Sequence, residues 1–284
     1  MLPTATKKGY LVVFSRPTHP AFSTSHDSFN KWYNEVHIPD ILRFGRSDGF
    51  TCAFRYARAG FDPSDPSTAS SSSFSSSAAT ASPSATTAPS SAVTASSSAA
   101  TATGTTATAK ANEASEVTYP KNEKWLYLAM CPVPDVTKAS RPDSGLYKAP
   151  LVHELLPEGK SAMEVAKWEL GFWEVVGEME REGENDSPKD TDVILVPVDS
   201  SDIPGYDVPG AHPSALLDYS RKGWEGPDPV RSRLLKYTAP AYNCCDGTGI
   251  KQYLAVHEVE PSTEQRLKPE FKTVKYKFYK KFGV

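Results

Sequence analysis

The sequence has few cysteines and no residue spacing typical of a metal site. Its four cysteines, Cys52, Cys131, Cys244 and Cys245, form no CxxC pair, and the adjacent Cys244 and Cys245 fit neither a zinc knuckle nor a simple disulfide framework. The six histidines show no HxH, HxxxH or HExxH spacing. We therefore expect reduced thiols, no bound metal and a cytoplasmic location.

Other signatures are also missing. No GxGxxG, GxxxxGK[ST] or GxSxG motif occurs, so nucleotide-binding and serine-hydrolase functions have no support and no cofactor is expected. The formal net charge is -3, and no basic patch lies outside the C-terminal end, which argues against nucleic-acid binding. The N-terminal residues contain no apolar segment long enough for a signal peptide or a membrane span.

Large apolar side chains are scarce in one long segment. Residues 64–115 are almost entirely Ser, Ala and Thr and show no periodicity. Such a segment buries too little surface to offset the conformational entropy of ordering it. We expect a disordered insert at about residues 62–118, placed between two strands, because long insertions in loops cost little free energy.

The rest of the chain alternates between strand and helix patterns. Short apolar runs predict strands, and the ambiguous run 168–179 is assigned to a strand because its aromatic residues alternate and because Gly171 and Gly177 disfavour a helix. Strands are expected at residues 10–15, 50–56, 125–133, 168–179, 192–198, 230–237 and 252–259. Helices are expected from about residue 25 to 38 and at residues 144–156, 213–222 and 271–282.

A weak internal repeat relates the two halves of the chain. Residues 125–129 (WLYLA) parallel residues 251–255 (KQYLA), and each half has the order β-α-β-β-α with an expected closing strand. This order predicts an α+β protein with two ferredoxin-like (βαββαβ) units that pack face to face around a barrel-like core. The first unit is expected at residues 1–182 and the second at residues 183–284.

The helix predicted near residue 30 has the most distinctive pattern. Apolar side chains recur at helical spacing, and Tyr33 and His37 lie one turn apart on one face. Pro39 disfavours helical geometry at the preceding residue, which predicts that the helix ends at about His37 or Ile38.

This pattern, Phe29-x-x-Trp32-Tyr33-x-x-Val36-His37-x-Pro39, resembles the helix motif of the EthD-like members of the dimeric α+β barrel superfamily. The tandem arrangement resembles fungal members in which two units are fused. The resemblance implies a pocket between helix and sheet in each unit, and it maps the family's helix histidine onto His37. Residues 213–224 of the second unit contain no histidine before a proline, so the second unit is expected to be degenerate and the catalytic pocket to lie in the first.

The predicted chemistry centres on proton transfer by His37. An imidazole titrates near neutral pH, so it can act as a general acid or base. Tyr33 would orient it or bind a substrate oxygen, and Asp40 would hold its tautomer. The alternative is that His37 caps the helix C-terminus, where a cationic side chain is favoured.

Five further residues are predicted to bind substrate. They are Trp32, Phe29, Phe54, Tyr127 and His257. For Trp32 and Phe29 the alternative is a purely structural place in the core. For His257 the alternative is a buried histidine whose hydrogen bonds are satisfied within the fold.

Three functions are consistent with these observations. The relatives implied by the resemblance include polyketide-processing decarboxylases, cyclases, muconolactone-type isomerases, anthrone oxygenases without metal, and proteins without known activity. The first hypothesis is a cofactor-independent cyclisation, decarboxylation or isomerisation of an aromatic or polyketide-like small molecule. An EthD-like oxygenase component and a non-catalytic small-molecule-binding or stress-associated barrel protein are the alternatives. The protein is expected to be a monomer with a fused pseudo-dimer or a homodimer.

Overall fold

The computed structural model describes most of the chain outside the Ser/Ala/Thr-rich segment. The described residues are 6–22, 25–63, 119–120, 124–181, 190–198, 212–222, 224–225, 227–242, 250–261, 266–267 and 273–283. The insert expected at about residues 62–118 and most of the expected linker at 180–190 lie outside them. No helix in these ranges is long and apolar enough to cross a membrane.

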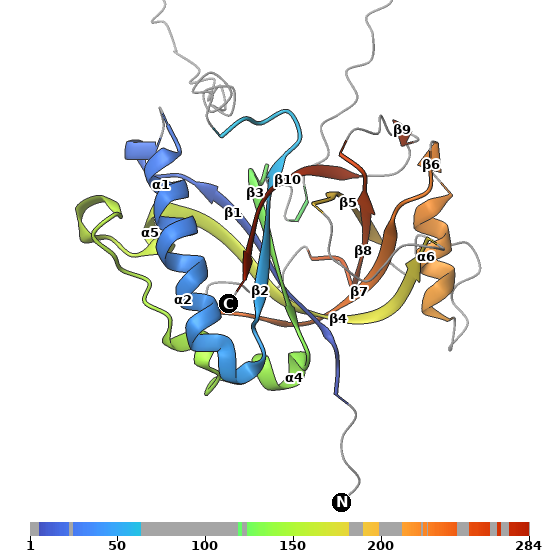
Figure 1. The fold of residues 1–284 in the computed structure, drawn as a ribbon, viewed down its shortest axis with the longest axis horizontal. Helices are drawn as coiled ribbons and strands as arrows, with labels where there is room; N and C mark the ends of the chain where they lie inside the picture. Colours follow the sequence, from blue (N-terminus) through green and yellow to red (C-terminus); the bar gives the residue numbers. More distant parts are fainter. Residues whose placement is uncertain are drawn as a thin grey trace, which may run out of the picture. The chain divides into compact units, whose positions relative to one another are not determined.

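Eight strands form a closed antiparallel barrel (Figure 1). Around the barrel the order is β1-β3-β2-β10-β5-β8-β7-β4. The strands are β1 (Gly9–Pro17), β2 (Cys52–Arg58), β3 (Tyr127–Val133), β4 (Ala166–Glu180), β5 (Asp192–Val198), β7 (Arg231–Pro240), β8 (Tyr253–Val259) and β10 (Val274–Gly283). A separate two-stranded sheet pairs β6 (Trp224–Glu225) with β9 (Arg266–Leu267).

Helices cover opposite outer faces of the barrel. On one side lie α1 (Asp27–Trp32), a π-helical turn (Tyr33–His37) and α2 (Ile38–Phe44), and on the other lies α6 (Pro213–Arg221) (Figure 1). The remaining helices are short: α4 (Val136–Ala139), α5 (Ala162–Val165) and 3-10 turns at Pro20–Phe22, Gly45–Asp48, Gly145–Lys148 and Pro157–Gly159.

The strand order repeats in the two halves of the chain. In the first half the order is β4-β1-β3-β2, and in the second it is β10-β5-β8-β7. The long strand β4 pairs with β1 over its first part and with β7 over its second, while β10 pairs with both β2 and β5. These two seams join the halves and leave no open edge in the barrel.

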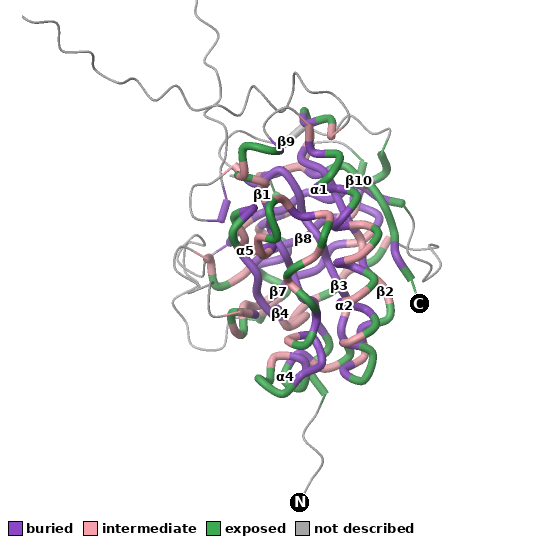
Figure 2. Tube along the Cα trace, turned by 90° about the vertical axis from the view of Figure 1, so that its left-hand side faces the viewer, coloured by how far each residue is buried: buried purple, intermediate pink, exposed green. Residues whose placement is uncertain are grey.

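Because side chains on a strand point alternately to the two faces, the barrel has three buried clusters. One fills the barrel interior, with Val12, Leu128 and Leu195 among its members. A second lies between the outer face and the first helix, and a third lies under α6. Figure 2 shows the barrel strands as mainly buried segments, with exposed residues on the surrounding helices and loops.

The C-terminal segment expected as a helix is a strand. Residues 274–283 form β10, which closes the barrel between β2 and β5. The spacing of Phe278 and Phe282 fits one face of a helix. It also fits a strand, in which the register shifts between Phe278 and Lys280. As a strand, the segment forms backbone hydrogen bonds with two neighbouring strands, and this pairing favours the strand over the helix. The closing strand expected from the repeat is thus supplied by the segment assigned to a helix.

The helix expected at residues 144–156 is also wrong. Only a 3-10 turn, Gly145–Lys148, forms there. The hydroxyl of Ser144 and the backbone N–H of Gly145 both donate to the buried Asp48 carboxylate at 2.8 Å, and Pro150 prevents a longer helix from propagating.

The first helix does not end at Pro39. The backbone N–H of Ile38 donates to the carbonyl of Tyr33, five residues earlier, so a π-helical turn precedes Pro39. Pro39 then falls in the first turn of α2, where a missing N–H is tolerated. His37 therefore lies inside a continuous helical segment rather than at a C-terminus, and the proposed capping role does not apply.

The remaining strand predictions agree with the structure within a few residues. Residues 192–198 form β5 with the bounds expected, and the ambiguous run 168–179 lies within β4. At Gly171 an added Cβ would lie 2.5 Å from the ring of Tyr237, so glycine allows this close packing between β4 and β7. The expected helix at 213–222 is α6.

Candidate functional site

A largely apolar pocket lies between the first helical segment and the outer face of the barrel. Its cavity volume is only about 20 Å³, room for about one water molecule, so a larger ligand requires the lining side chains to move apart. The helix contributes Tyr33, His37, Ile38 and Ile41, and the sheet contributes Leu11, Val13, Ala129, Cys131 and Leu170. Leu146, Leu151, Met163, Trp168 and Tyr242 complete the lining. We call this the helix pocket.

His37 is held in the helix pocket by aromatic rings. Its imidazole stacks on the indole of Trp32, with ring centroids 4.6 Å apart and an interplanar angle of 21°, and the ring of Tyr33 lies 5.4 Å away. His37 is 9% exposed, and burial lowers its pKa to about 4. Its Nδ1 is buried without a hydrogen-bond partner among the described residues. The imidazole is therefore neutral at pH 7.

Tyr33 connects the helix pocket to a buried arginine. The guanidinium carbon of Arg55 lies 4.5 Å from the centroid of the Tyr33 ring and 4.4 Å from that of Tyr127. Arg55 is fully buried and donates to the side-chain oxygens of Asn34 at 2.6 Å and Asn30 at 2.7 Å. Burial raises the pKa of Tyr33 despite this positive charge, so its hydroxyl stays protonated.

Asp40 does not join His37 and Tyr33. Its carboxylate pairs with Arg43 at 3.1 Å on the outer side of the helix. No hydrogen bond connects Asp40 to His37 in the described ranges, and Nδ1 of His37 is unpartnered there. The tautomer-holding role expected of Asp40 has no geometric support.

The aromatic residues predicted to bind substrate lie behind the helix pocket rather than in its lining. Phe29 and Trp32 are fully buried, with ring centroids 5.8 Å apart. Tyr127 is also buried, and its hydroxyl lies 3.0 Å from Nδ1 of His26. Burial, followed by the charge of Arg55, lowers the pKa of His26 to about 4. These rings hold the helix and Arg55 in place.

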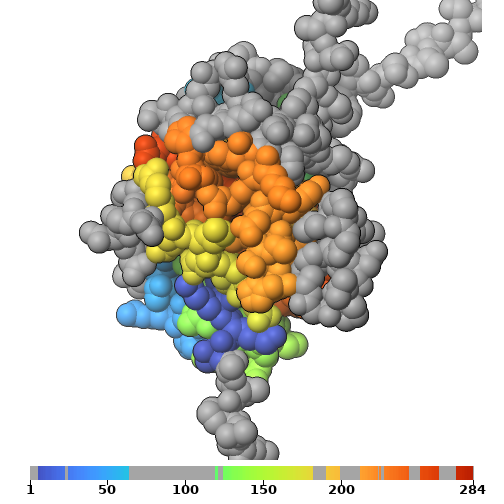
Figure 3. All heavy atoms as spheres, turned by 90° about the vertical axis from the view of Figure 1, so that its right-hand side faces the viewer, coloured from blue at the N-terminus to red at the C-terminus, as the bar shows by residue number. Residues whose placement is uncertain are grey.

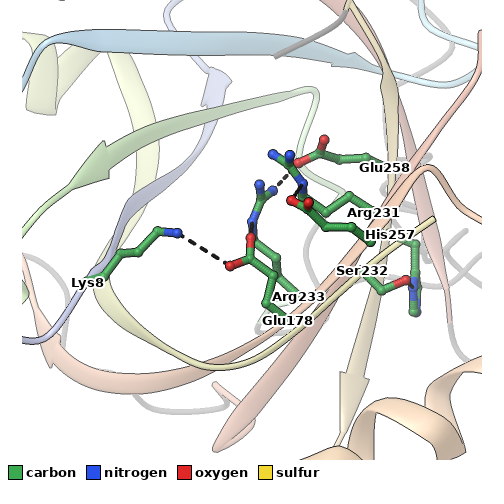
Figure 4. A network of polar contacts seen from close by, with 8 residues as sticks. Lys8, Glu178, Arg231, Ser232, Arg233, His257 and Glu258 are labelled. Carbon is green, nitrogen blue, oxygen red and sulfur yellow. Dashed lines mark hydrogen bonds and ion pairs between the residues drawn. The ribbon is translucent and has the colours of Figure 1, made fainter. Parts of the chain in front are cut away.

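The other two predicted residues do not line the helix pocket. Phe54 faces a different cavity at one end of the barrel. His257 on β8 is fully buried next to the α6 side of the sheet, where its Nδ1 lies 2.9 Å from the hydroxyl of Ser232 (Figure 4). Burial lowers the pKa of His257 to about 3. From the predicted set, only Tyr33 and His37 line the helix pocket, and Trp32 stacks on His37 from outside the lining.

Several pocket residues were not identified from the sequence. Trp168 stacks on Tyr33, with ring centroids 5.9 Å apart and an interplanar angle of 16°, and Met163 comes from the preceding α5. Tyr242 follows β7, so the second half of the chain supplies part of the helix pocket. Its hydroxyl donates to the carbonyl of Leu146 at 3.2 Å. No local motif marks these residues, because pairing of β4 with β1 brings Trp168 to His37 and pairing of β7 with β4 brings Tyr242 there.

The helix pocket combines a neutral imidazole, a protonated phenol and apolar walls. This set can accept a proton and donate a hydrogen bond within a region of low dielectric. Among the described residues, no group of three or more His, Cys, Asp or Glu side chains could hold a metal ion. In comparisons with known proteins, no family model, curated protein or solved structure matches this chain.

Proposed function

We propose that the protein is a cofactor-independent enzyme that acts on an aromatic or polyketide-like carbonyl compound in the helix pocket, with His37 as the general base. The observation that supports this most is that His37 and Tyr33, one turn apart in sequence, line the same apolar pocket. Isomerisation and cyclisation are the favoured reactions, because both begin with removal of a proton from carbon.

The proposed step follows from the protonation states. Neutral His37 takes a proton from the carbon next to the substrate carbonyl, and the C–H electron pair moves to the carbonyl oxygen to form an enolate. The protonated hydroxyl of Tyr33 donates a hydrogen bond to this oxygen. In an isomerisation, His37 then returns its proton to another carbon. In a cyclisation, the enolate carbon attacks a second carbonyl of the substrate, and the alkoxide that forms takes the proton back from His37. A base of low pKa is adequate when the enolate is stabilised in this way.

The finer fold assignment belongs to the same proposal. Two ferredoxin-like units, at residues 1–182 and 183–284, would form a fused dimeric α+β barrel of the EthD-like kind. The identical strand order in the two halves supports this assignment, as does a helix on each outer face. The second half of the first unit departs from the plan, because α4 and α5, each four residues long, lie where a longer helix is expected.

Non-catalytic binding of a small molecule is the second candidate. It is favoured by the absence of any carboxylate hydrogen-bonded to Nδ1 of His37 among the described residues. An apolar pocket with one phenol and one imidazole is also sufficient to bind an aromatic ligand.

Incubation with representative substrates distinguishes the two candidates. We would add an aryl diketo acid and an unsaturated γ-lactone to the full-length protein in D2O and follow products and deuterium incorporation by ¹H NMR. Catalysis predicts conversion that His37→Gln abolishes, whereas Tyr33→Phe lowers kcat more than it raises KM. Binding of a probe without conversion or deuterium uptake, under conditions where the protein is folded, would support the binding role instead. Decarboxylation of the diketo acid that survives His37→Gln would contradict the role given to His37.

A further inference from the structure

A second cavity lies at one end of the barrel interior, separate from the helix pocket. It contains about 660 Å³ of empty space, including the part open to solvent. Its lining comes from the first residues of β1, β2 and β7 and the last residues of β3 and β8, which meet at the same end of the antiparallel barrel. Phe54, Met130 and Pro132 provide apolar walls. We call this cavity the barrel-end pocket.

Two buried tyrosines present hydroxyl groups to the barrel-end pocket. Tyr10 is 7% exposed and Tyr56 is 5% exposed, and both line the cavity. Within the described ranges, the structure shows no hydrogen bond from either hydroxyl. Burial raises the pKa of both tyrosines, so both hydroxyls are available as donors. Neither hydroxyl oxygen is among the buried unpartnered atoms, so both are accessible and can donate to an oxygen atom of a ligand.

The charged residues around the barrel-end pocket balance one another. Arg233 binds Glu178 through Nε at 2.7 Å and also binds Glu258, as Figure 4 shows. Arg231 binds Glu180 at 2.5 Å, and Lys8 binds Glu178 at 3.4 Å. The three cations are thus matched by three carboxylates. In Figure 4, Arg231 and Arg233 lie on one side of β7, while Ser232 points away from them towards His257.

We propose that the barrel-end pocket binds an uncharged aromatic carbonyl compound, with the hydroxyls of Tyr10 and Tyr56 donating to its carbonyl oxygen. The ring of the ligand packs against the apolar wall formed by the neighbouring side chains of Phe54 and Met130. Because the ion pairs leave no net charge for a carboxylate ligand, the pocket favours the neutral compound over an anion of the same size. This site is independent of His37 and of the activity proposed for the helix pocket.

Ligand-observed ¹⁹F NMR titration tests this proposal. The probes are 4-fluoroacetophenone and 4-fluorobenzoate, which share ring and size and differ in charge. We expect the ketone to bind at least fivefold more tightly than the benzoate. Tyr10→Phe and Tyr56→Phe should each raise the Kd of the ketone three- to tenfold, the range expected for one lost hydrogen bond. Tyr279→Phe, a matched substitution at an exposed tyrosine that lines neither pocket, should leave the Kd within twofold.

Three outcomes would overturn the proposal. They are unchanged ketone binding in the Tyr10→Phe/Tyr56→Phe double variant, preference for the benzoate, and loss of ketone binding in Tyr33→Phe, which would place the probe in the helix pocket. Because Tyr→Phe keeps the ring, the variants should fold, and near-UV circular dichroism verifies this. If a Tyr→Phe variant is misfolded, Met130→Trp is used instead, because it fills the cavity from β3, between the strands that carry Tyr10 and Tyr56, and should abolish ketone binding.

Discussion

The two halves of the barrel share a strand order but differ in what lies beneath their helices. Under α6, Leu216 and Leu217 pack on Leu234 and Ala255, each 1% exposed or less. Under the first helical segment, partly exposed side chains such as Leu151 line the helix pocket. Figure 3 shows the α6 side of the molecule, where orange and yellow segments of α6, β7 and β4 lie against one another.

Among the described residues, the first half contains two buried histidines, His26 and His37, and the second half contains His257. His257 lies on a strand, where its Nδ1 shares a hydrogen bond with Ser232 while its Nε2 is buried without a partner among the described residues. His37 lies on a helix, and its Nδ1 likewise has no partner there. Burial of a polar group that lacks a hydrogen bond costs stability. Both imidazoles carry this cost, and they differ in that Nδ1 of His257 is bonded to Ser232 of β7 whereas His37 lines the helix pocket.

The largest expected effect is on packing. Leu217→Ala should lower the free energy of unfolding by about 2–5 kcal/mol, because it leaves a cavity in a closed core. Leu151→Ala in the helix pocket should lower it by less than about 1.5 kcal/mol, since its side chain is partly exposed. Urea denaturation of both variants measures the difference. Equal losses would show that the two helices are packed alike.

The next effect is acid sensitivity. His37 has a pKa near 6.5 in the unfolded protein and about 4 in the folded protein. Above pH 6.5 both states hold a neutral imidazole and the free energy of unfolding is at its full value. As the pH falls from 6.5 towards 4, only the unfolded state gains the proton, so the free energy of unfolding decreases. His37→Leu should reduce the loss of unfolding free energy between pH 7.5 and 5 by about 2 kcal/mol. His257→Leu should reduce it by a similar amount, because its pKa is also lowered. An unchanged pH dependence in His37→Leu would mean that His37 is solvated.

At pH 7.5 the same two variants should differ from each other. His37→Leu replaces a buried imidazole whose Nδ1 has no described partner, so we expect a change within about 1 kcal/mol of zero. His257→Leu leaves the buried hydroxyl of Ser232 without this hydrogen bond and should cost about 1–3 kcal/mol. Thermal and urea unfolding give both values. A greater loss for His37→Leu would assign it a structural role.

The smallest effect is expected for Asp40. Its ion pair with Arg43 lies at the surface, so Asp40→Asn should change the free energy of unfolding by less than about 1 kcal/mol. Turnover should also be unchanged, because the carboxylate is not bonded to His37. A tenfold loss of kcat with unchanged stability would restore the role that the sequence suggested for Asp40.

Much of the barrel was predictable because strand patterns are local. The runs that became β1, β5 and β8 are apolar and bounded by polar or turn residues, so neighbouring residues decide their structure. β10 was missed because its apolar spacing fits a helix equally well. Only its pairing with β2 and β5 distinguishes a strand from a helix at these residues.

The candidate site was predictable only where it is local as well. Tyr33 and His37 share one helix face, and that relation survives the unexpected π-helical turn. The contributions of Trp168 and Tyr242 depend on how distant segments meet around the barrel. The same is true of the ion pairs at the barrel-end pocket, whose members come from β4, β7 and β8.

The most direct test compares two glutamine substitutions on one substrate. His37→Gln and His257→Gln each replace a buried imidazole by a neutral amide, one in each half, and unfolding experiments first establish that both variants fold. With a probe that the wild-type protein converts, His37→Gln should lower kcat by about 10²–10⁴-fold, the usual contribution of a general base, while His257→Gln stays within threefold of wild type. Equal kcat values for the folded His37→Gln variant and the wild type would contradict the account.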